Sequence, residues 1–265
     1  MQWGVGRLSC WLVAFWMAGA GMMSADASPS SGLADTVAAI KPSIVAVGTT
    51  DPIPGTPPNF MGTGFVVGDG NYVVTALHVV TSTPLDIQRR QELAVYSGTG
   101  NHFRIQLATI VSRDALHDLV LLHVSGLNLP VLHFGVAETL REGTSLAFTG
   151  FPLGYVLGLY PVTHTATLSS ITPIVMPVLS SQELTGRQIR QMPTPYPVFQ
   201  LDATAFPGNS GSPLYEVNSG HVVGLLNLVA VRETKEAVLA SLSGVAYAVP
   251  GNYIEALLVS AGVTP

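Results

Sequence analysis

Cysteine is almost absent from this chain of 265 residues, which contains Cys10 and no other. No internal disulfide can form, so the fold must be held together by its hydrophobic core. Charged side chains are also scarce, at 10%, whereas 48% of the residues are hydrophobic. The 16 Asp and Glu residues outnumber the 11 Lys and Arg residues and give a net charge of −5. This balance provides no basic surface for nucleic acid, which we do not expect as a partner.

Long apolar runs are also missing, and the one candidate lies near the N-terminus. Residues 11–20 are apolar but fall short of the ~20 residues that a membrane span needs. Because Arg7 precedes this run and small residues follow it, residues 1–27 resemble a secretory signal peptide with cleavage after Ala27. An uncleaved anchor is the alternative. We expect residues 28–265 to form a periplasmic or secreted domain without stable membrane insertion after cleavage.

Metal-binding patterns are not found either. The seven histidines show no metal-ligand spacing, and Cys10 would be lost with the signal peptide. We therefore expect no metal and no cofactor.

Short β-branched and apolar runs separated by turn residues make up most of the remaining sequence, which predicts an all-β sandwich or barrels. A join near 127–135 separates a half at about 42–127 from a half at about 136–250. Apolar residues at helical spacing predict one short helix at 33–40 and a second at 253–259. The expected strands are 44–47, 63–67, 72–75, 93–96, 103–111, 119–124, 146–149, 162–168, 198–201, 222–227 and 245–249.

Three short motifs carry side chains with catalytic potential. They are Thr75-Ala76-Leu77-His78-Val79-Val80, His117-Asp118-Leu119-Val120-Leu121-Leu122 and Gly208-Asn209-Ser210-Gly211-Ser212-Pro213-Leu214. A serine hydroxyl needs a base to take its proton, and a buried carboxylate can fix the imidazole that does so. We predict Ser210 as the nucleophile, His78 as the general base and then acid, and Asp118 as the orienting carboxylate.

Gly208, two residues before Ser210, predicts a second function for this loop. Gly208 allows a backbone conformation that lets the N–H groups of Gly208 and Ser210 converge on an oxyanion, with Asn209 as the spacer between them. Asp114 is a rival to Asp118 for the carboxylate role. His117 should point away from Asp118, toward the surface or behind the site.

With these motifs in place, the chain resembles a trypsin-like serine protease of the HtrA/Deg type. Members carry Gly-x-Gly-Phe, Thr-Ala-x-His-Val, Asp-Leu-Ala-x-Leu and Gly-Asn-Ser-Gly-Gly-Pro-Leu, which residues 62–65, 75–79, 118–122 and 208–214 match. The sequence departs from the pattern at Ser212, where the family usually has glycine. Segments 150–154, 201–205 and 244–250 are similar to further family motifs, so the resemblance runs from about residue 33 to 259.

This resemblance implies two six-stranded antiparallel β-barrels with the three residues in the cleft between them. It also implies endopeptidase activity in the bacterial envelope and makes a homo-oligomer possible. HtrA proteins usually carry PDZ modules after the protease domain, and we expect none here. By the same resemblance, segments 202–207 and 224–227 line the substrate pocket. Leu225 and Leu226 would then favour aliphatic side chains, or both would face a barrel interior.

The leading interpretation is a serine endopeptidase that acts on extended or unfolded polypeptides through an acyl-enzyme. One alternative is a catalytically silent, protease-like module that binds unfolded proteins as a chaperone would. A second is an esterase, but an α/β-hydrolase serine lies in Gly-x-Ser-x-Gly before a long helix, and here Ser212 and strands follow Ser210.

Overall fold

The computed structural model describes Met1 and residues 32–52, 56, 58–82, 85–86, 90–154, 158–174, 195–227 and 244–265. The expected signal peptide therefore lies outside the described residues, apart from Met1. Contacts divide the chain into 1–30 and 31–265, and the fold described below belongs to the second unit. No described helix is long and apolar enough to cross a membrane.

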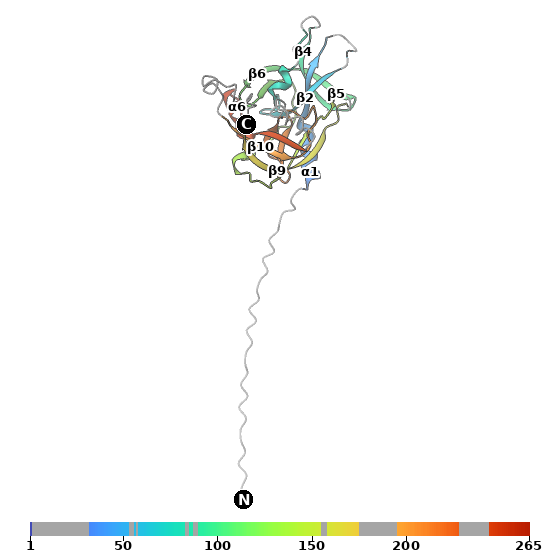
Figure 1. Cartoon of the computed structure of the whole chain (residues 1–265). Coiled ribbons are helices and arrows are strands. Elements are labelled where there is room, and N and C mark those ends of the chain that lie inside the picture. The colour runs from blue at the N-terminus through green and yellow to red at the C-terminus, as the bar shows by residue number, and fades with distance from the viewer. Residues whose placement is uncertain are drawn as a thin grey trace, which may run out of the picture. The chain divides into compact units, whose positions relative to one another are not determined.

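The first half of this unit forms one antiparallel sheet of seven strands in the order β5-β4-β1-β2-β3-β7-β6. Its strands β2, β4, β5 and β6 are labelled in Figure 1. The strands are β1 Ile44–Thr50, β2 Asn59–Val67, β3 Tyr72–Ala76, β4 Glu92–Thr99, β5 His102–Leu107, β6 Thr109–Asp114 and β7 Leu119–His123. A tight turn at Gly68–Gly70 joins β2 to β3.

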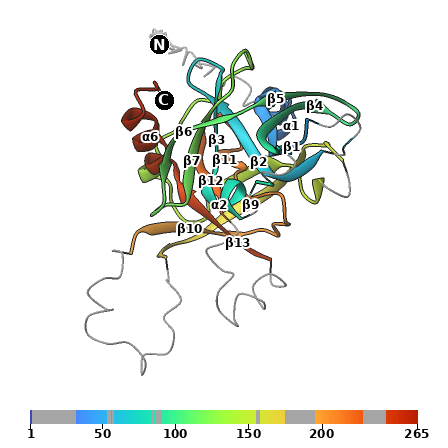
Figure 2. The same ribbon diagram turned by 90° about the horizontal axis from the view of Figure 1, so that it is seen from above.

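The second half forms a closed barrel of six strands in the order β10-β13-β12-β11-β8-β9 (Figure 2). Its strands are β8 Ser145–Gly150, β9 Val162–Pro173, β10 Pro197–Asp202, β11 Pro213–Glu216, β12 Val222–Leu226 and β13 Val245–Pro250. The loop from β10 to β11 carries Ser210, so the barrel wall fixes both ends of the serine motif.

Three short α-helices lie within the described part of this unit: α1 Leu33–Ile40, α2 Leu77–Thr81 and α6 Gly251–Ser260. Helices α1 and α6 lie on opposite sides of the strands in both views (Figures 1 and 2). The face of α6 that carries Ile254, Leu257 and Leu258 is buried, as the helical spacing predicts. The buried face anchors α6 to both halves, because the helix contacts β6 and β7 of the sheet and β12 and β13 of the barrel.

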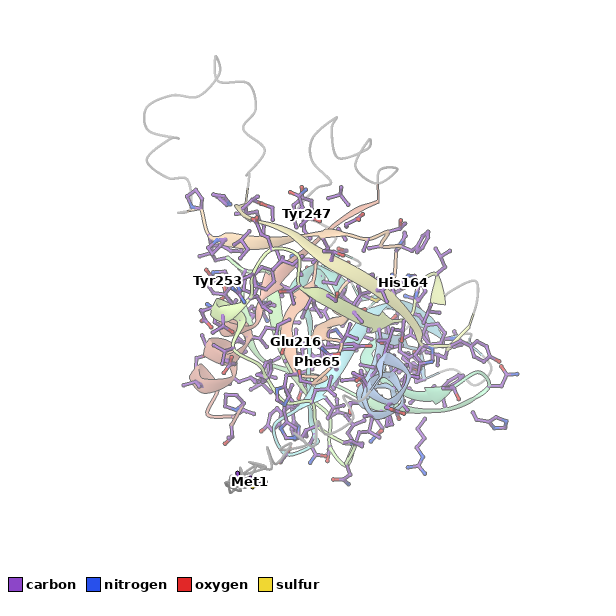
Figure 3. The ribbon with its side chains drawn as sticks, turned by 90° about the horizontal axis from the view of Figure 1, so that it is seen from below. Met1, Phe65, His164, Glu216, Tyr247 and Tyr253 are labelled. Carbon is purple, nitrogen blue, oxygen red and sulfur yellow. The ribbon has the colours of Figure 1, made fainter. Side chains whose placement is uncertain are left out.

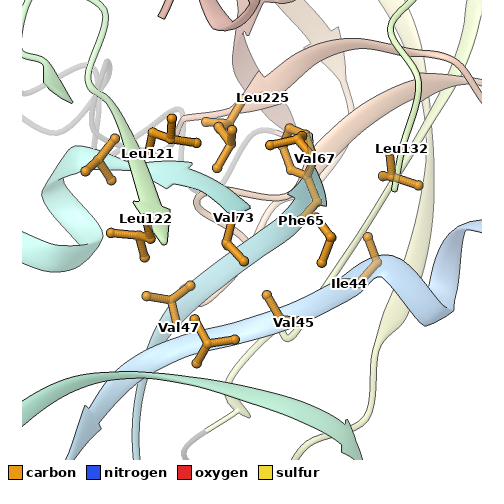
Figure 4. Packing of buried hydrophobic residues seen from close by; sticks show 14 of the residues in the cluster. Ile44, Val45, Val47, Phe65, Val67, Val73, Leu121, Leu122, Leu132 and Leu225 are labelled. Atoms are coloured by element: carbon orange, nitrogen blue, oxygen red, sulfur yellow. The ribbon is translucent and has the colours of Figure 1, made fainter. Parts of the chain in front are cut away.

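The core is built from alternating apolar side chains of neighbouring strands. Figure 4 shows valines of β1, β2 and β3 packed with Phe65 and the leucines of β7. Leu225 of β12 joins this cluster, whereas Leu226 packs in a separate cluster inside the barrel. The second half thus contributes to the core of the first, which holds the two halves together.

The prediction of two six-stranded barrels is confirmed in part. The second half is a closed six-stranded barrel, but the first is a seven-stranded sheet whose edge strands β5 and β6 do not pair within the described residues. The difference arises at 103–111, expected to be one strand. The run divides at Ala108, because residues up to Leu107 pair with β4 whereas residues from Thr109 onward pair with β7.

The prediction also missed β11, whose four residues begin with a proline and give too short a pattern to recognise.

Candidate active site

His78 lies in the first turn of α2, immediately after β3. Ala76 is still extended, and the helix begins at Leu77. Two backbone N–H groups at this junction bond to Asp118. Leu77 N–H donates to the Asp118 carbonyl at 2.9 Å, and His78 N–H donates to Asp118 Oδ1 at 2.8 Å. The backbone that carries the imidazole is therefore attached to the carboxylate that contacts the ring.

Asp118 lies just before β7 and has a left-handed backbone with φ +55°. Its Oδ2 is 2.5 Å from His78 Nδ1 and accepts a bond from Asn227 Nδ2 at 3.0 Å. When Asp118 is a carboxylate it can only accept, so Nδ1 carries the proton and Nε2 is left as an acceptor. This tautomer is the one that a general base needs. Both side chains are largely shielded, with exposed fractions of 18% for His78 and 22% for Asp118.

The loop that carries Ser210 has its peptide carbonyls held in place from residue 207 to residue 210. Pro207 O accepts from Leu153 N–H at 2.7 Å, and Asn209 O accepts from Ser212 N–H at 3.0 Å. Pro207 C=O shares a peptide with Gly208 N–H, and Asn209 C=O shares one with Ser210 N–H. Because the N–H of a trans peptide points opposite to its C=O, the Gly208 and Ser210 N–H groups point away from the donors that hold these carbonyls. Neither N–H has a partner among the described residues.

Gly208 must be glycine for this arrangement. Its φ is +98°, and an added side-chain carbon would lie 2.3 Å from Phe151 O. The glycine therefore allows both the left-handed backbone and the close approach of segment 151–153.

Ser210 is brought beside the segment that carries His78. A side-chain carbon at Gly62 would lie 2.6 Å from Val79 Cγ2 and 3.0 Å from Ser210 O. Val79, the residue after His78, and Ser210 therefore both pack closely against Gly62. Ser210 is 5% exposed. Within the described part of the chain, no hydrogen bond joins its hydroxyl to His78, whose ring bonds to Asp118.

Asn209 and Ser212 are buried behind the loop. Both amide atoms of Asn209 and the hydroxyl of Ser212 lack a hydrogen-bond partner in the described structure. Such groups destabilise a fold by about 1–3 kcal/mol each when unpaired. The loop is therefore held by its backbone carbonyls rather than by its own side chains.

Of the two positions predicted for His117, the structure leaves the one behind the site, because its side chain is only 12% exposed and bonds to Asp114 rather than to Asp118. Its Nδ1 is 2.5 Å from Asp114 Oδ2, and its ring stacks on Tyr253 at 3.9 Å. Tyr253 lies on α6, on the opposite side of the molecule from His164 (Figure 3). The Asp114 carboxylate thus bonds to His117, whereas Asp118 is the carboxylate that contacts His78.

Three pKa values are shifted in this neighbouring cluster, and burial raises that of Tyr253. Burial alone would raise the pKa of Asp114, but the hydrogen bonds and charge of His117 outweigh it and lower the pKa below the ordinary 3.8. Burial, and then the charges of Asp118 and Asp114, raise the pKa of Tyr196 to about 12. Tyr196 packs edge-on against the His117 ring, with the two ring centres 4.5 Å apart.

Leu225 and Leu226 do not supply the expected pocket walls. Both are fully buried, and they point to opposite sides of β12, into the two separate cores. The alternative, that both face the barrel interior, holds for Leu226 alone. The aliphatic preference inferred from these side chains therefore has no support.

Two residues with a structural role at this site were not recognised in the sequence. Asn227, seen only as a pocket residue, donates to Asp118 across 109 residues of sequence. Thr63 bonds to the Ser210 loop across 145 residues. Its position between Gly62 and Gly64 was the available signal, since paired glycines indicate close backbone approach. The described residues include no group of three metal-ligating side chains.

The comparison with protein families agrees with this fold and with these motifs. The model of the trypsin-like peptidase domain matches residues 62–225, more than half of the chain. The chain belongs to this family of trypsin-like peptidase domains.

Its relatives support the resemblance to HtrA/Deg proteins, which is confirmed. A DegP-like periplasmic serine endoprotease of Pseudomonas putida is 28% identical over 190 residues, which cover 72% of this chain and 32% of the relative. The mitochondrial serine protease HTRA2 of Drosophila willistoni is 26% identical, with 74% and 37% covered. The chain thus spans about a third of the length of these curated relatives.

Solved structures share the fold. The active form of the Rv3671c protease from M. tuberculosis superposes with a TM-score of 0.61 at 25% identity, covering 89% of this chain and 88% of that one. The HtrA-type protease AlgW with a decapeptide gives a TM-score of 0.62 at 18% identity, covering 86% and 67%.

Proposed function

We propose that this chain is a serine-type endopeptidase that hydrolyses peptide bonds of extended or unfolded polypeptides. The observation that carries the proposal is the pairing of His78 with Asp118, beside a serine loop whose Gly208 and Ser210 N–H groups have no protein partner in the described structure. That combination of an oriented base and unused donors is what acyl transfer requires.

In the proposed mechanism, Ser210 Oγ attacks the peptide carbonyl while His78 Nε2 takes its proton. Asp118 stabilises the resulting imidazolium, and the Gly208 and Ser210 N–H groups hold the oxyanion, with Asn209 as their spacer. Collapse of the tetrahedral intermediate breaks the C–N bond as His78 donates the proton to the leaving amine. A water molecule, deprotonated by His78, then hydrolyses the acyl-enzyme. Catalytic hydrogen bonds often tighten only when substrate binds, which accommodates the absent Ser210–His78 bond.

We further propose that residues 28–265 are the protease domain and residues 1–27 its signal peptide, which places the domain in the periplasm or outside the cell. The periplasmic DegP-like relatives support this location. Polypeptides are the proposed partners, and self-association into a homo-oligomer remains part of the proposal by likeness to HtrA proteins.

The test compares wild type with Ser210→Ala on casein and on a short-chain ester. We expect casein cleavage by wild type and a loss of at least about 10³-fold in Ser210→Ala, because the remaining residues cannot form an acyl-enzyme. Ser219→Ala is the matched control, since this serine lies in the exposed turn between β11 and β12. Thermal unfolding should be the same for all three proteins.

Undiminished proteolysis in Ser210→Ala would refute the assignment. Hydrolysis of the ester with no cleavage of casein would favour the esterase, and binding of unfolded casein without any cleavage by wild type would favour the silent module.

A further inference from the structure

Thr63 of β2 is fully buried, and all of its polar groups bond to other segments. Its N–H donates to Ser210 O at 2.9 Å, and its hydroxyl donates to Gly208 O at 2.7 Å. The same hydroxyl accepts from Phe151 N–H at 2.9 Å, and the Thr63 carbonyl accepts from Thr75 Oγ1 at 2.6 Å. One residue of the first sheet therefore holds two loops of the second barrel.

Along the loop, the carbonyls held by Thr63 alternate with the carbonyls whose bonds orient the Gly208 and Ser210 N–H groups. Leu153 and Ser212 hold the carbonyls of residues 207 and 209, and Thr63 holds those of residues 208 and 210. Within the described residues, Thr63 supplies the one side chain that bonds to the backbone of 207–210. The side chain of Asn209 supplies no such bond, since its polar atoms are unpaired.

We infer that Thr63 is a positioning residue that keeps the Gly208 and Ser210 N–H groups aimed at the oxyanion, an inference that rests on the proposed function. The hydroxyl acts through the backbone and does not touch substrate. Its bond to Phe151 N–H also places segment 151–153, whose Leu153 N–H holds Pro207 O. Loss of the hydroxyl would remove one bond to each loop, to Gly208 O and from Phe151 N–H, and would leave the bond from Thr63 N–H to Ser210 O in place.

The test replaces Thr63 with valine, which keeps the shape but removes the hydroxyl, and with serine, which keeps the hydroxyl. Thr36→Val is the matched control, because Thr36 is also buried and its hydroxyl donates one bond, to Val217 O at 2.8 Å. The readouts are kcat and KM on a peptide substrate, the rate of fluorophosphonate labelling at Ser210, and thermal unfolding.

We expect Thr63→Val to lower kcat and the labelling rate by about 10–100-fold, less than the 10²–10³ typical of losing an oxyanion donor outright. KM should stay within about twofold, because the interaction is made in the transition state. Thr63→Ser should recover most of the wild-type kcat, and Thr36→Val should keep it. If Thr63→Val does not fold, Thr63→Ala against Thr63→Ser makes the same comparison.

A wild-type kcat in the folded variant that lacks the hydroxyl would overturn the inference. A rise in KM alone, or an equal loss of kcat in Thr36→Val, would do the same. These results leave the proposed function standing, whereas a wild-type protein that neither labels at Ser210 nor cleaves peptide overturns the proposed function itself.

Discussion

Gly150 lies under the Ser210 loop, at the point where its polar side chains crowd together. A side-chain carbon there would lie 2.1 Å from Ser212 Oγ, 2.8 Å from Thr63 Oγ1 and 3.1 Å from Asn209 Oδ1. Ser212 is also the position at which the sequence departs from the HtrA pattern. The chain has therefore fitted a hydroxyl into the space that Gly150 leaves free.

Gly150→Ala should displace Ser212 and disturb the loop, lowering the free energy of unfolding by about 1–3 kcal/mol. Adding Ser212→Gly removes the nearest contact, so the double variant should recover part of that loss, with a coupling energy of about 1 kcal/mol. Denaturant unfolding of both single variants and the double variant measures this. Gly32→Ala is the control, because open space surrounds Gly32. Strictly additive effects would contradict the account.

Asp118 illustrates how much a single residue can organise. Its backbone carbonyl and both carboxylate oxygens accept bonds from Leu77, His78 and Asn227. Asn227 immediately follows β12, which ends at Leu226, so the carboxylate is fixed by both halves of the domain. A side chain held from several directions keeps the imidazole in one orientation, which is the function we assign to it.

At the scale of elements, β6, β7 and α6 meet at the paired His117 and Asp114. The stacking of His117 on Tyr253 connects the turn before Asp118 to the closing helix. This cluster gives the fold a predictable response to acid, because the pKa of Asp114 is lowered in the folded state.

Since the folded pKa lies below the unfolded one, the contribution of Asp114 to stability is present above about pH 4 and is lost as the pH falls through the folded pKa. Asp114→Asn should therefore be less stable than wild type at pH 7, with a difference that shrinks as the pH falls below 3.8. Chemical denaturation from pH 7 to pH 2 gives the comparison. A difference that is the same at every pH would argue against the pairing.

The sequence predicts the individual helices and strands of this fold better than it predicts which strands pair to close a barrel. Hydrophobic spacing located α1, α6 and most strands, because each pattern is contained within a few residues. It could not show that one run divides at Ala108 into β5 and β6, since the two parts pair with different strands, β4 and β7. Nor could it show which edges pair.

The same limit applies to the candidate site. His78, Asp118 and Ser210 stand in short motifs with recognisable chemistry, so they could be predicted. Thr63 and Asn227 act through bonds that span 145 and 109 residues, and no local pattern encodes those partners. Leu225 and Leu226 could not be assigned to a face until the register of β12 was known.

At the scale of the whole molecule, the proposed chemistry depends on the contact between the two halves. His78 lies on α2 and Asp118 lies just before β7, both in the first half, and the loop after β10 in the second half carries Ser210. Thr63 and Asn227 are the residues that bond across this junction near the site. The shared core around Leu225 keeps the halves together without a disulfide.

The most direct measurement is covalent labelling of the folded protein with a fluorophosphonate, followed by mass-spectrometric mapping of the adduct. The account predicts one adduct, on Ser210, in wild type, and a loss of at least about 10³-fold in its rate of formation in His78→Ala with unchanged thermal unfolding. A folded wild-type protein that acquires no adduct, or a His78→Ala variant labelled at the wild-type rate, would contradict it.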